Sequence, residues 1–342
     1  MKDLKDKTPD ELAAMVAELG GKPYLAKYIF AFLHTKNAAA ISDITPLSKA
    51  FRAKLSEQGY CVSQLKTVES LTDPDGSTKF LFELADGERV EAVLLMDGAR
   101  KTLCVSTQVG CVMGCAFCAT GRIKLRRSLT AGEIADEVNQ AEAAVGKINN
   151  VVYMGMGEPL ENYDAVLKSV GILNHPSGKN IGIRHITIST CGIAPAIRKL
   201  ATEKLRPRLA ISLNAPSDAL RSRIMPINRT YRLDELFQAI RTYQSRTQQR
   251  VTFEYVMIDK LNDAASHAEL LIKLLKGVSC NVNLIEHNPY PGCKLAGSRR
   301  DRIALFATLL KDAGIETVTR FKLGRHIKAA CGQLQAGYEQ GS

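Results

Sequence analysis

Three closely spaced cysteines are the strongest chemical signal in the sequence. Cys111, Cys115 and Cys118 form a C-x3-C-x2-C motif within a segment that also carries glycine. Thiolates at this spacing can converge on one inorganic centre, and three of them would leave one iron of a four-iron cluster open to a chelating ligand. From the spacing alone, two alternatives remain: a zinc site that borrows a fourth ligand, and buried cysteines without a common role.

The remaining cysteines and the N-terminus bear on the cellular compartment. The chain has nine cysteines, an odd number, and its N-terminus (MKDLKDKTPDELAAM) lacks an apolar core for export. No apolar run approaches the ~18 residues of a membrane span. We therefore expect a cytoplasmic protein without a membrane partner, where clustered cysteines serve metal or redox chemistry more often than structural disulfides.

The charge balance indicates an anionic partner. The 342 residues include 46 basic and 35 acidic side chains, which gives a net charge of +11. An excess of this size predicts attraction to a polyanion, either nucleic acid or an anionic surface. Apolar residues make up 45% and charged residues 24%, a globular composition that argues against wholesale disorder.

Strands and helices are predicted to alternate from residue 102 onward. The candidate strands are 102–107, 150–154, 185–189, 208–213, 251–258 and 281–287, with 316–321 as a candidate edge strand. This alternation implies a parallel α/β sheet, either open or curled into part of a barrel. Short helices are predicted up to residue 59, and three strands with tight turns over 65–97 predict an antiparallel meander.

Unusual residues cluster just after the predicted strands, where parallel α/β folds bind their ligands. The cysteine motif follows the first strand, and Gly157 and Glu158 follow the second. Later strands end near Ser189, Asn214 and Asn288. The sequence therefore predicts that these segments share one site.

The ordered set of motifs resembles the RlmN/Cfr family of radical S-adenosylmethionine (SAM) enzymes, which are dual-specificity RNA adenine methyltransferases. The resemblance spans nearly the whole chain. It rests on KPYLAK from residue 22, QVGCVMGCAFCATG from residue 108, GMGEP from residue 155, MPINR from residue 225 and AACGQL from residue 329.

The resemblance implies a fold and a set of cofactors. We expect an α/β fold with a partial (β/α)6 TIM-like barrel as radical-SAM core (101–322). It should follow an N-terminal helical accessory RNA-binding domain (1–62) and a β-meander (63–100), and precede a C-terminal tail (323–342). The implied cofactors are a [4Fe-4S] cluster on the three motif cysteines and two SAM molecules per turnover, one as methyl donor and one as radical source. The implied SAM contacts are Gly157, Glu158, Ser189, Ser212, Leu213, Asn214 and Asn288.

Three further residues match the family's catalytic positions. Cys331 matches the methyl-carrying cysteine, Cys104 its resolving partner in a transient Cys104–Cys331 disulfide, and Glu91 the proton acceptor. Without the resemblance, Cys104 would most simply be a small core residue and Cys331 an ordinary thiol. Glu91 would then be an exposed glutamate on a strand.

The implied reaction is ping-pong methylation of carbon 2 of an adenosine in the peptidyl-transferase centre of 23S rRNA, and of an adenosine next to the anticodon in tRNAs. The alternative is Cfr-like methylation of carbon 8, which confers antibiotic resistance. A radical-SAM maturase and a zinc RNA-binding module are more distant options. The implied partners are 23S rRNA, tRNA and an electron donor of reductase, flavodoxin or ferredoxin type, and the chain is expected to be a monomer.

Basic residues flank the predicted site, and one segment departs from the family pattern. Leu323-Gly-Arg-His326-Ile stands where the family usually reads Arg-Gly-x-Asp-Ile, a change that bears on RNA contacts or on the position of the tail. Basic residues near the site are candidate contacts to RNA phosphates, although a solvated surface would explain any single one. They are Arg122, Lys124, Arg126, Arg127, Arg299, Arg300, Arg302, Arg320, Lys322, Arg325 and Lys328.

Overall fold

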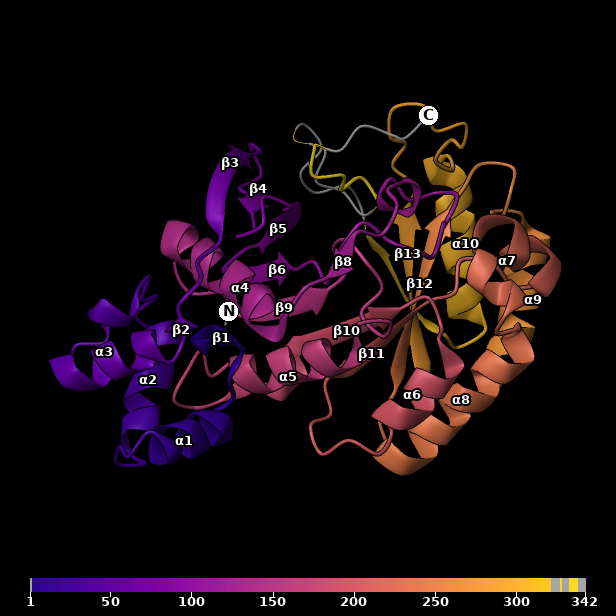
Figure 1. Ribbon diagram of the computed structural model, residues 1–342. Helices are drawn as coiled ribbons and strands as arrows, with labels where there is room; N and C mark the ends of the chain where they lie inside the picture. Colours follow the sequence, from indigo (N-terminus) through magenta and orange to yellow (C-terminus); the bar gives the residue numbers. More distant parts are fainter. Residues whose placement is uncertain (1, 321–326, 328–331, 338–342) are drawn as a thin grey trace.

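The computed structural model describes residues 2–320, 327 and 332–337 (Figure 1). A small helical module begins the chain, with its helices where the sequence predicts them. Helix α1 starts with a capping box, in which the Thr8 hydroxyl accepts from the Glu11 amide and the Glu11 carboxylate accepts from the Thr8 amide. The module comprises β1 (Lys2–Asp3), α1 (Pro9–Glu18), α2 (Leu25–His34), α3 (Lys49–Glu57) and β2 (Tyr60–Cys61).

One ten-stranded sheet organises the rest of the chain, in the order β14-β13-β12-β11-β10-β9-β6-β5-β4-β3. Strands β3 to β6 pair antiparallel, whereas β6, β9, β10, β11, β12, β13 and β14 pair parallel. The strands are β3 (Lys66–Thr72), β4 (Thr78–Glu83), β5 (Arg89–Asp97), β6 (Arg100–Cys104), β9 (Asn150–Tyr153), β10 (Ile186–Thr190), β11 (Arg208–Ser212), β12 (Val251–Met257), β13 (Cys280–Glu286) and β14 (Glu316–Arg320).

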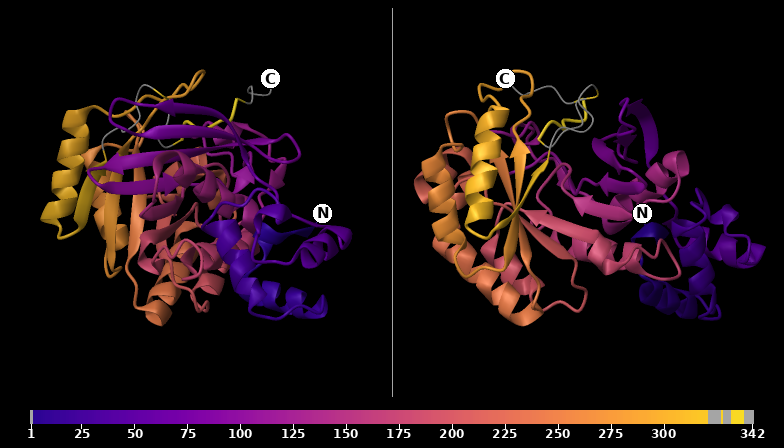
Figure 2. Two further views of the ribbon diagram at one scale, coloured as in Figure 1. Left: turned by 90° about the vertical axis from the view of Figure 1, so that its left-hand side faces the viewer. Right: turned by 180° about the vertical axis from the view of Figure 1, so that it is seen from behind.

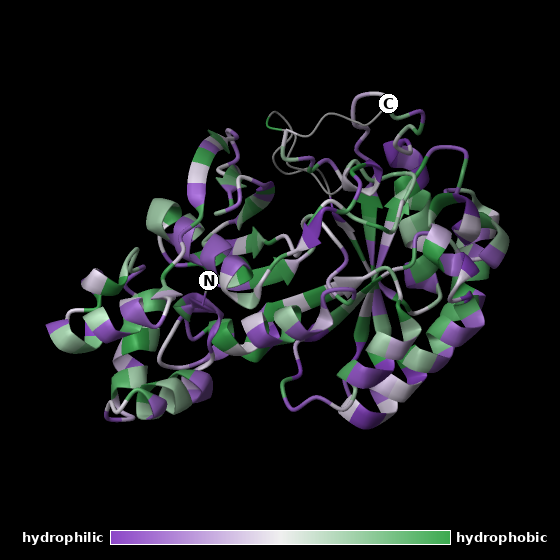
Figure 3. Cartoon of the chain, viewed as in Figure 1, coloured by the Kyte–Doolittle hydropathy of each residue, from purple (hydrophilic) through white to green (hydrophobic). Residues whose placement is uncertain are grey.

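Helices between the parallel strands cover the outer side of the curved sheet (Figures 1 and 2). Helix α4 begins at a capping box formed by Thr130 and Glu133. Figure 3 shows hydrophobic strands beneath helices of mixed character, as expected for helices with one buried face. The helices are α4 (Ala131–Val145), α5 (Tyr163–Asn174), α6 (Ala194–Leu200), α7 (Asp218–Ile224), α8 (Leu233–Thr247), α9 (Ala265–Leu275) and α10 (Arg300–Asp312).

The predicted α/β fold is confirmed: helices alternate with the strands of a curved, mostly parallel sheet (Figure 1). The meander is not a separate layer, because β5 pairs antiparallel with β6 and so extends the parallel sheet. The segments on either side of the cysteine motif pair as a two-stranded antiparallel ribbon of β7 (Gln108–Val109) and β8 (Arg127–Ser128). No helix in the described part of the chain is long and apolar enough to span a membrane.

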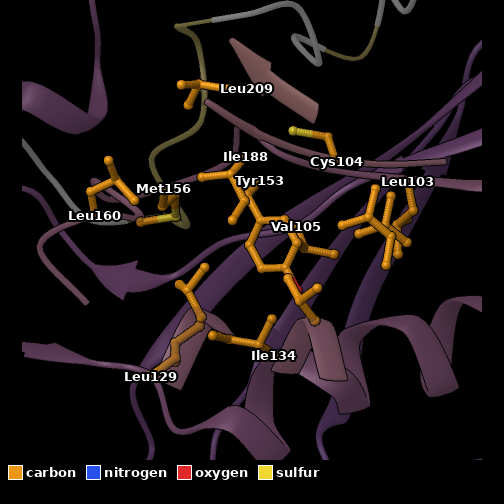
Figure 4. Close-up of a cluster of buried hydrophobic side chains, with 14 of the residues drawn as sticks. Leu103, Cys104, Val105, Leu129, Ile134, Tyr153, Met156, Leu160, Ile188 and Leu209 are labelled. Atoms are coloured by element: carbon orange, nitrogen blue, oxygen red, sulfur yellow. The ribbon is translucent and has the colours of Figure 1, made fainter. Parts of the chain in front are cut away.

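Aliphatic and aromatic side chains fill the space between β6, β9 and α4. Leu103, Val105, Ile134 and Tyr153 are fully buried there (Figure 4). Cys104 lies at the edge of this cluster, with its sulfur directed away from Leu103, as the alternation of side chains along a strand requires. The core therefore presents Cys104 on the opposite face of β6.

A buried ion pair joins the helical module to the core. Lys5 Nζ lies 2.5 Å from Asp136 Oδ1 on α4, and the two side chains are 0% and 2% exposed. The second oxygen of Asp136 accepts from the Leu65 amide, 2.8 Å away. Removing one partner of such a pair would leave the other buried charge without a counter-charge, which is costly. This contact therefore fixes where the module sits on α4.

Candidate active site

One cavity at the carboxyl ends of the parallel strands brings most of the predicted site together. Its wall includes all three motif cysteines and five of the seven predicted SAM contacts: Cys111, Cys115, Cys118, Gly157, Glu158, Ser189, Ser212 and Asn214. Leu213 and Asn288 are not part of this wall. Leu213 is fully buried in the core, and the Asn288 amide donates to the Glu286 carbonyl at 3.0 Å.

The loop that carries the cysteines is held from three directions. The Cys111 amide donates to the Ile123 carbonyl at 3.1 Å, and the Ala116 amide donates to the carbonyl of Ile224 at the end of α7 at 2.9 Å. From the segment after β13, the Tyr290 hydroxyl donates to the Ala116 carbonyl at 3.2 Å. These contacts fix the backbone on both sides of Cys115, so the thiols are oriented by the fold before any ligand binds.

Burial affects the pKa of all three thiols in the same direction. Burial raises the pKa of Cys111 to about 12, raises that of Cys115 well above its ordinary value and also raises that of Cys118. The raised pKa values mean that the protonated thiols are favoured without a metal. A bound metal centre has the opposite effect, because it stabilises the thiolate form that ligates it. In residues 2–320, 327 and 332–337, no three His, Cys, Asp or Glu side chains come close enough to hold a single ion. All three cysteines line one cavity, and cysteine thiolates are the ligands of iron–sulfur clusters, so the residues present fit such a cluster.

Gly157 and Glu158 form a tight connection after β9. Gly157 has φ of +98°, and a Cβ there would lie 2.6 Å from Gln108 Cβ, so only glycine fits. Glu158 is 4% exposed, and its two oxygens accept from the amides of Leu160 at 3.0 Å and Cys191 at 2.8 Å. Burial raises the pKa of Glu158. Its carboxylate thus ties the ends of β9 and β10 together at the cavity wall.

Asn214 also shapes the cavity through its own contacts. It adopts φ of +59°, a left-handed conformation that asparagine tolerates. Its amide accepts from the Val256 amide at 2.9 Å and donates to Met225 Sδ at 3.3 Å. The side chain therefore supports the turn after β11, at the point where Ser212 enters the cavity wall.

Arg221 on α7 is a site-supporting residue that the sequence did not predict. It is fully buried, and its guanidinium donates to the carbonyls of Cys191 at 2.5 Å, Leu213 at 3.0 Å and Ser212 at 3.2 Å, and to Asn228 Oδ1 at 3.1 Å. It thereby ties the ends of β10 and β11 together behind the cavity. A single arginine in a short helix gives no periodic or spacing signal, which is why sequence reasoning missed it.

Glu91 and Cys104 lie on one face of the β5–β6 hairpin. Val93 on β5 pairs with Cys104 on β6, and Glu91 is two residues from Val93, so all three side chains share a face. Cys104 is 8% exposed and Glu91 is 5% exposed. The alternative interpretation of Glu91 as an exposed strand residue is therefore wrong.

The C-terminal segment contacts both Glu91 and the cysteine loop. Glu91 Oε1 lies 3.0 Å from Lys79 Nζ, and Glu91 Oε2 accepts from the Gln335 amide at 2.7 Å. The Gly332 carbonyl accepts from the Ala119 amide at 2.7 Å, beside the cysteine loop. The predicted methyl carrier, Cys331, lies outside the described residues, as do Leu323 and His326.

Several of the basic residues predicted to contact RNA are paired within the chain. Arg126 lies 2.9 Å from Glu88, and Arg127 lies 2.8 Å from Glu133. Arg122 lies over the Tyr290 ring, 5.9 Å from its centroid. These ion pairs hold the segment around β8, which follows the cysteine loop, against neighbouring elements. The arginines therefore have a structural role in addition to any contact with phosphates. Lys322, Arg325 and Lys328 lie outside the described residues.

Two family models match the chain. Residues 105–271 match the Radical SAM superfamily, and residues 2–61 match the ribosomal RNA large subunit methyltransferase N-terminal domain. The chain is 44% identical over 339 residues, 99% of each chain, to a probable dual-specificity RNA methyltransferase RlmN of Thermoanaerobacter sp. (strain X514). It is 42% identical to the protein so described in Bacillus subtilis (strain 168), over 97% of this chain and 92% of that one.

A solved structure agrees with these matches. A radical SAM methyltransferase from Sphaerobacter thermophilus superposes with a TM-score of 0.92 at 42% identity, covering 98% of this chain and 100% of the other. The two family models, the full-length relatives and the full-length structural match all agree with the motifs around the cavity. The chain belongs to the RlmN family of radical SAM RNA methyltransferases.

Proposed function

We propose that this methyltransferase acts on carbon 2 of an adenosine in the peptidyl-transferase centre of 23S rRNA, and on an adenosine next to the anticodon in tRNAs. The support is full-length similarity to proteins described as probable dual-specificity RNA methyltransferases RlmN. The Cfr-like alternative on carbon 8 has no support in these comparisons. The excess of basic residues, +11 overall, suits either RNA.

The cavity residues fit the cofactors that the radical SAM family implies. In the proposal Cys111, Cys115 and Cys118 hold a [4Fe-4S] cluster, and Gly157 and Glu158 help to orient SAM beside it. Ser189, Ser212, Leu213, Asn214 and Asn288 complete the proposed SAM contacts. When bound, the two cofactors supply a transferable methyl group and one-electron cleavage of SAM, and we propose that two SAM molecules are used per turnover.

The protein's own residues then carry the one-carbon unit. In the proposal the Cys331 thiolate would accept the methyl group of one SAM as a nucleophile. The 5′-deoxyadenosyl group of a second SAM would take one hydrogen atom from this methyl group, so that its carbon can bond to carbon 2 of the adenine, and the surplus electron would pass back to the cluster. Glu91 takes the proton from carbon 2. The Cys104 thiolate then attacks the Cys331 sulfur, which breaks the bond between that sulfur and the new carbon substituent. The released carbon keeps the electron pair and takes up a proton to become the methyl group. A Cys104–Cys331 disulfide remains, and an external thiol must reduce it.

One observation carries this assignment more than any other. The C-terminal segment lies against both the cysteine loop and Glu91, through Gly332 at one end and Gln335 at the other. Gly332 directly follows Cys331 in the sequence. The contacts therefore support a tail whose residues directly after Cys331 in the sequence lie beside the cysteine loop and the proposed base.

The remaining assignments complete the proposal. The N-terminal domain (1–62) acts as an accessory RNA-binding domain, joined by the meander (63–100) to the core (101–322) and the tail (323–342). A reductase, flavodoxin or ferredoxin donates the electrons. The enzyme works as a monomer in the cytoplasm.

The test is anaerobic turnover of the cluster-loaded enzyme with methyl-labelled SAM and a 23S rRNA fragment, followed by mass spectrometry of the nucleosides. We expect 2-methyladenosine from the parent enzyme and from Cys280→Ala, a control on β13 that has no role in the proposal. Cys331→Ala should transfer no label to RNA. Undiminished transfer by Cys331→Ala, or 8-methyladenosine as the product, would contradict the proposal.

A further inference from the structure

A row of polar side chains crosses the floor of the active-site cavity. In the register of the parallel sheet, Ser212 on β11 stands opposite Glu254 on β12, and Glu254 stands opposite Asn283 on β13. Side chains at paired positions point to the same face of a sheet. Ser212 and Glu254 both line the cavity. The motifs gave no role to Glu254 or Asn283.

The Glu254 carboxylate is only half satisfied. Its Oε1 accepts from the Asn283 amide at 2.8 Å, whereas Oε2 has no hydrogen-bond partner among the described residues. The residue is 5% exposed, and burial raises the pKa of its carboxyl, an effect that the field of Arg320 only partly offsets. A buried polar oxygen without a partner is costly, so a native site that retains one usually binds something there.

Two other buried glutamates provide a comparison for Glu254. Glu158, the predicted SAM contact on the same wall, already accepts a backbone amide on each oxygen. Glu137 on α4 is fully buried and also has one oxygen without a partner in the described structure, but it lies outside the cavity wall. Glu254 combines an unsatisfied oxygen with a place on that wall.

We propose that Glu254 is a further SAM-binding residue, whose carboxylate accepts hydrogen bonds from the ribose hydroxyls of SAM, with Ser212 beside it. This inference rests on the proposed function, because it assumes that SAM occupies the cavity. A ribose offers two adjacent hydroxyl donors, and an acidic side chain at a strand end is a common partner for such hydroxyls in nucleotide sites. Asn283 holds the carboxylate in place and leaves its free oxygen available to the ligand.

The experiment measures binding and needs no turnover. The cluster-loaded protein is titrated calorimetrically, anaerobically and without reductant, with SAM and with its 2′-deoxyribose analogue. The variants are Glu254→Gln, which keeps the shape but loses the charge, and Glu254→Asp, which withdraws the carboxylate by one methylene. Glu137→Gln is the matched control, because it alters a buried glutamate away from the cavity. Iron content and circular dichroism check that each variant holds its cluster and its fold.

We expect the parent and Glu137→Gln to bind SAM about 10-fold or more tightly than the analogue. This ratio of affinities corresponds to the loss of one hydrogen bond to a charged group. Glu254→Gln and Glu254→Asp should reduce this ratio of affinities to within about 3-fold and should also weaken the binding of SAM itself. If both variants keep the parent's preference, even with weaker overall binding, Glu254 is a structural residue and the inference is wrong. A parent protein that binds no SAM would refute the proposed function instead, so the two failures are distinguishable.

Discussion

Arg221→Met tests whether the active-site cavity depends on a buried cation behind it. Methionine is close to arginine in length and apolar, so it fills much of the space without donating hydrogen bonds. The substitution removes the donors to the carbonyls of Cys191, Ser212 and Leu213 and to Asn228. Each of these acceptors lies at the end of a strand or in the turn that follows α7.

The size of the effect follows from two opposing terms. A hydrogen bond to a charged group contributes about 1.5–3 kcal/mol, so four of them contribute roughly 6–12 kcal/mol before other costs. The variant no longer has to desolvate a guanidinium that is 0% exposed. The absence of this cost offsets the loss of hydrogen bonds by several kcal/mol. We therefore expect Arg221→Met to lower the free energy of unfolding by about 3–5 kcal/mol.

The assay is urea unfolding of the metal-free, reduced protein, followed by circular dichroism because the chain contains no tryptophan. Arg223→Met is the matched control, since Arg223 lies on the same helix but is exposed. Its free energy of unfolding should change by less than about 0.5 kcal/mol. A loss below about 1 kcal/mol for Arg221→Met, or equal losses for the two variants, would refute the reasoning.

Three further substitutions probe other contacts. Gly157→Ala places a Cβ 2.6 Å from Gln108 at a φ of +98°, so calorimetry should show SAM binding at least about 10-fold weaker; unchanged affinity would show that the turn adapts. Lys5→Met leaves Asp136 as an unpaired buried charge, and urea unfolding should show a loss of about 3–5 kcal/mol, whereas a loss near zero would mean that the ion pair does not fix the N-terminal module. Burial raises the pKa of Glu137 in the folded state, so the folded protein binds its proton more tightly and loses stability as pH rises above the unfolded value of about 4.3. Unfolding from pH 5 to 7 should therefore show Glu137→Gln gaining stability relative to the parent as pH rises, and parallel curves would contradict this.

Local patterns were sufficient to predict the parallel strands. The segments 208–213 and 251–258 became β11 and β12 with bounds that differ by one residue at the carboxyl end, because buried parallel strands read as short apolar runs between turn residues. Thr130 and Glu133 form the capping box of α4, and Thr-x-x-Glu is a local sequence pattern typical of a helix start. The pairing of β5 with β6 was not predicted, because a meander and a parallel sheet give no local sign that they share an edge.

The site was predicted from motifs, and its supporting residues were not. The cysteines and Glu158 stand in distinctive segments after strands, and the structure places them around one cavity. Arg221 and Glu254 act through contacts between elements far apart in the sequence, which neither spacing nor composition encodes. Glu91 had been consistent with an exposed strand position, and only the pairing of β5 with both β4 and β6 explains its burial.

The most direct test of the account is whether the three motif cysteines hold a cluster that cleaves SAM. The protein is reconstituted anaerobically with iron and sulfide, its iron is counted, and it is then reduced in the presence of SAM. The account predicts about four iron atoms per chain with iron–sulfur absorption, formation of 5′-deoxyadenosine, and loss of both in Cys118→Ala. A reconstituted parent protein that holds no iron, or one that is reduced and yields no 5′-deoxyadenosine, would contradict it.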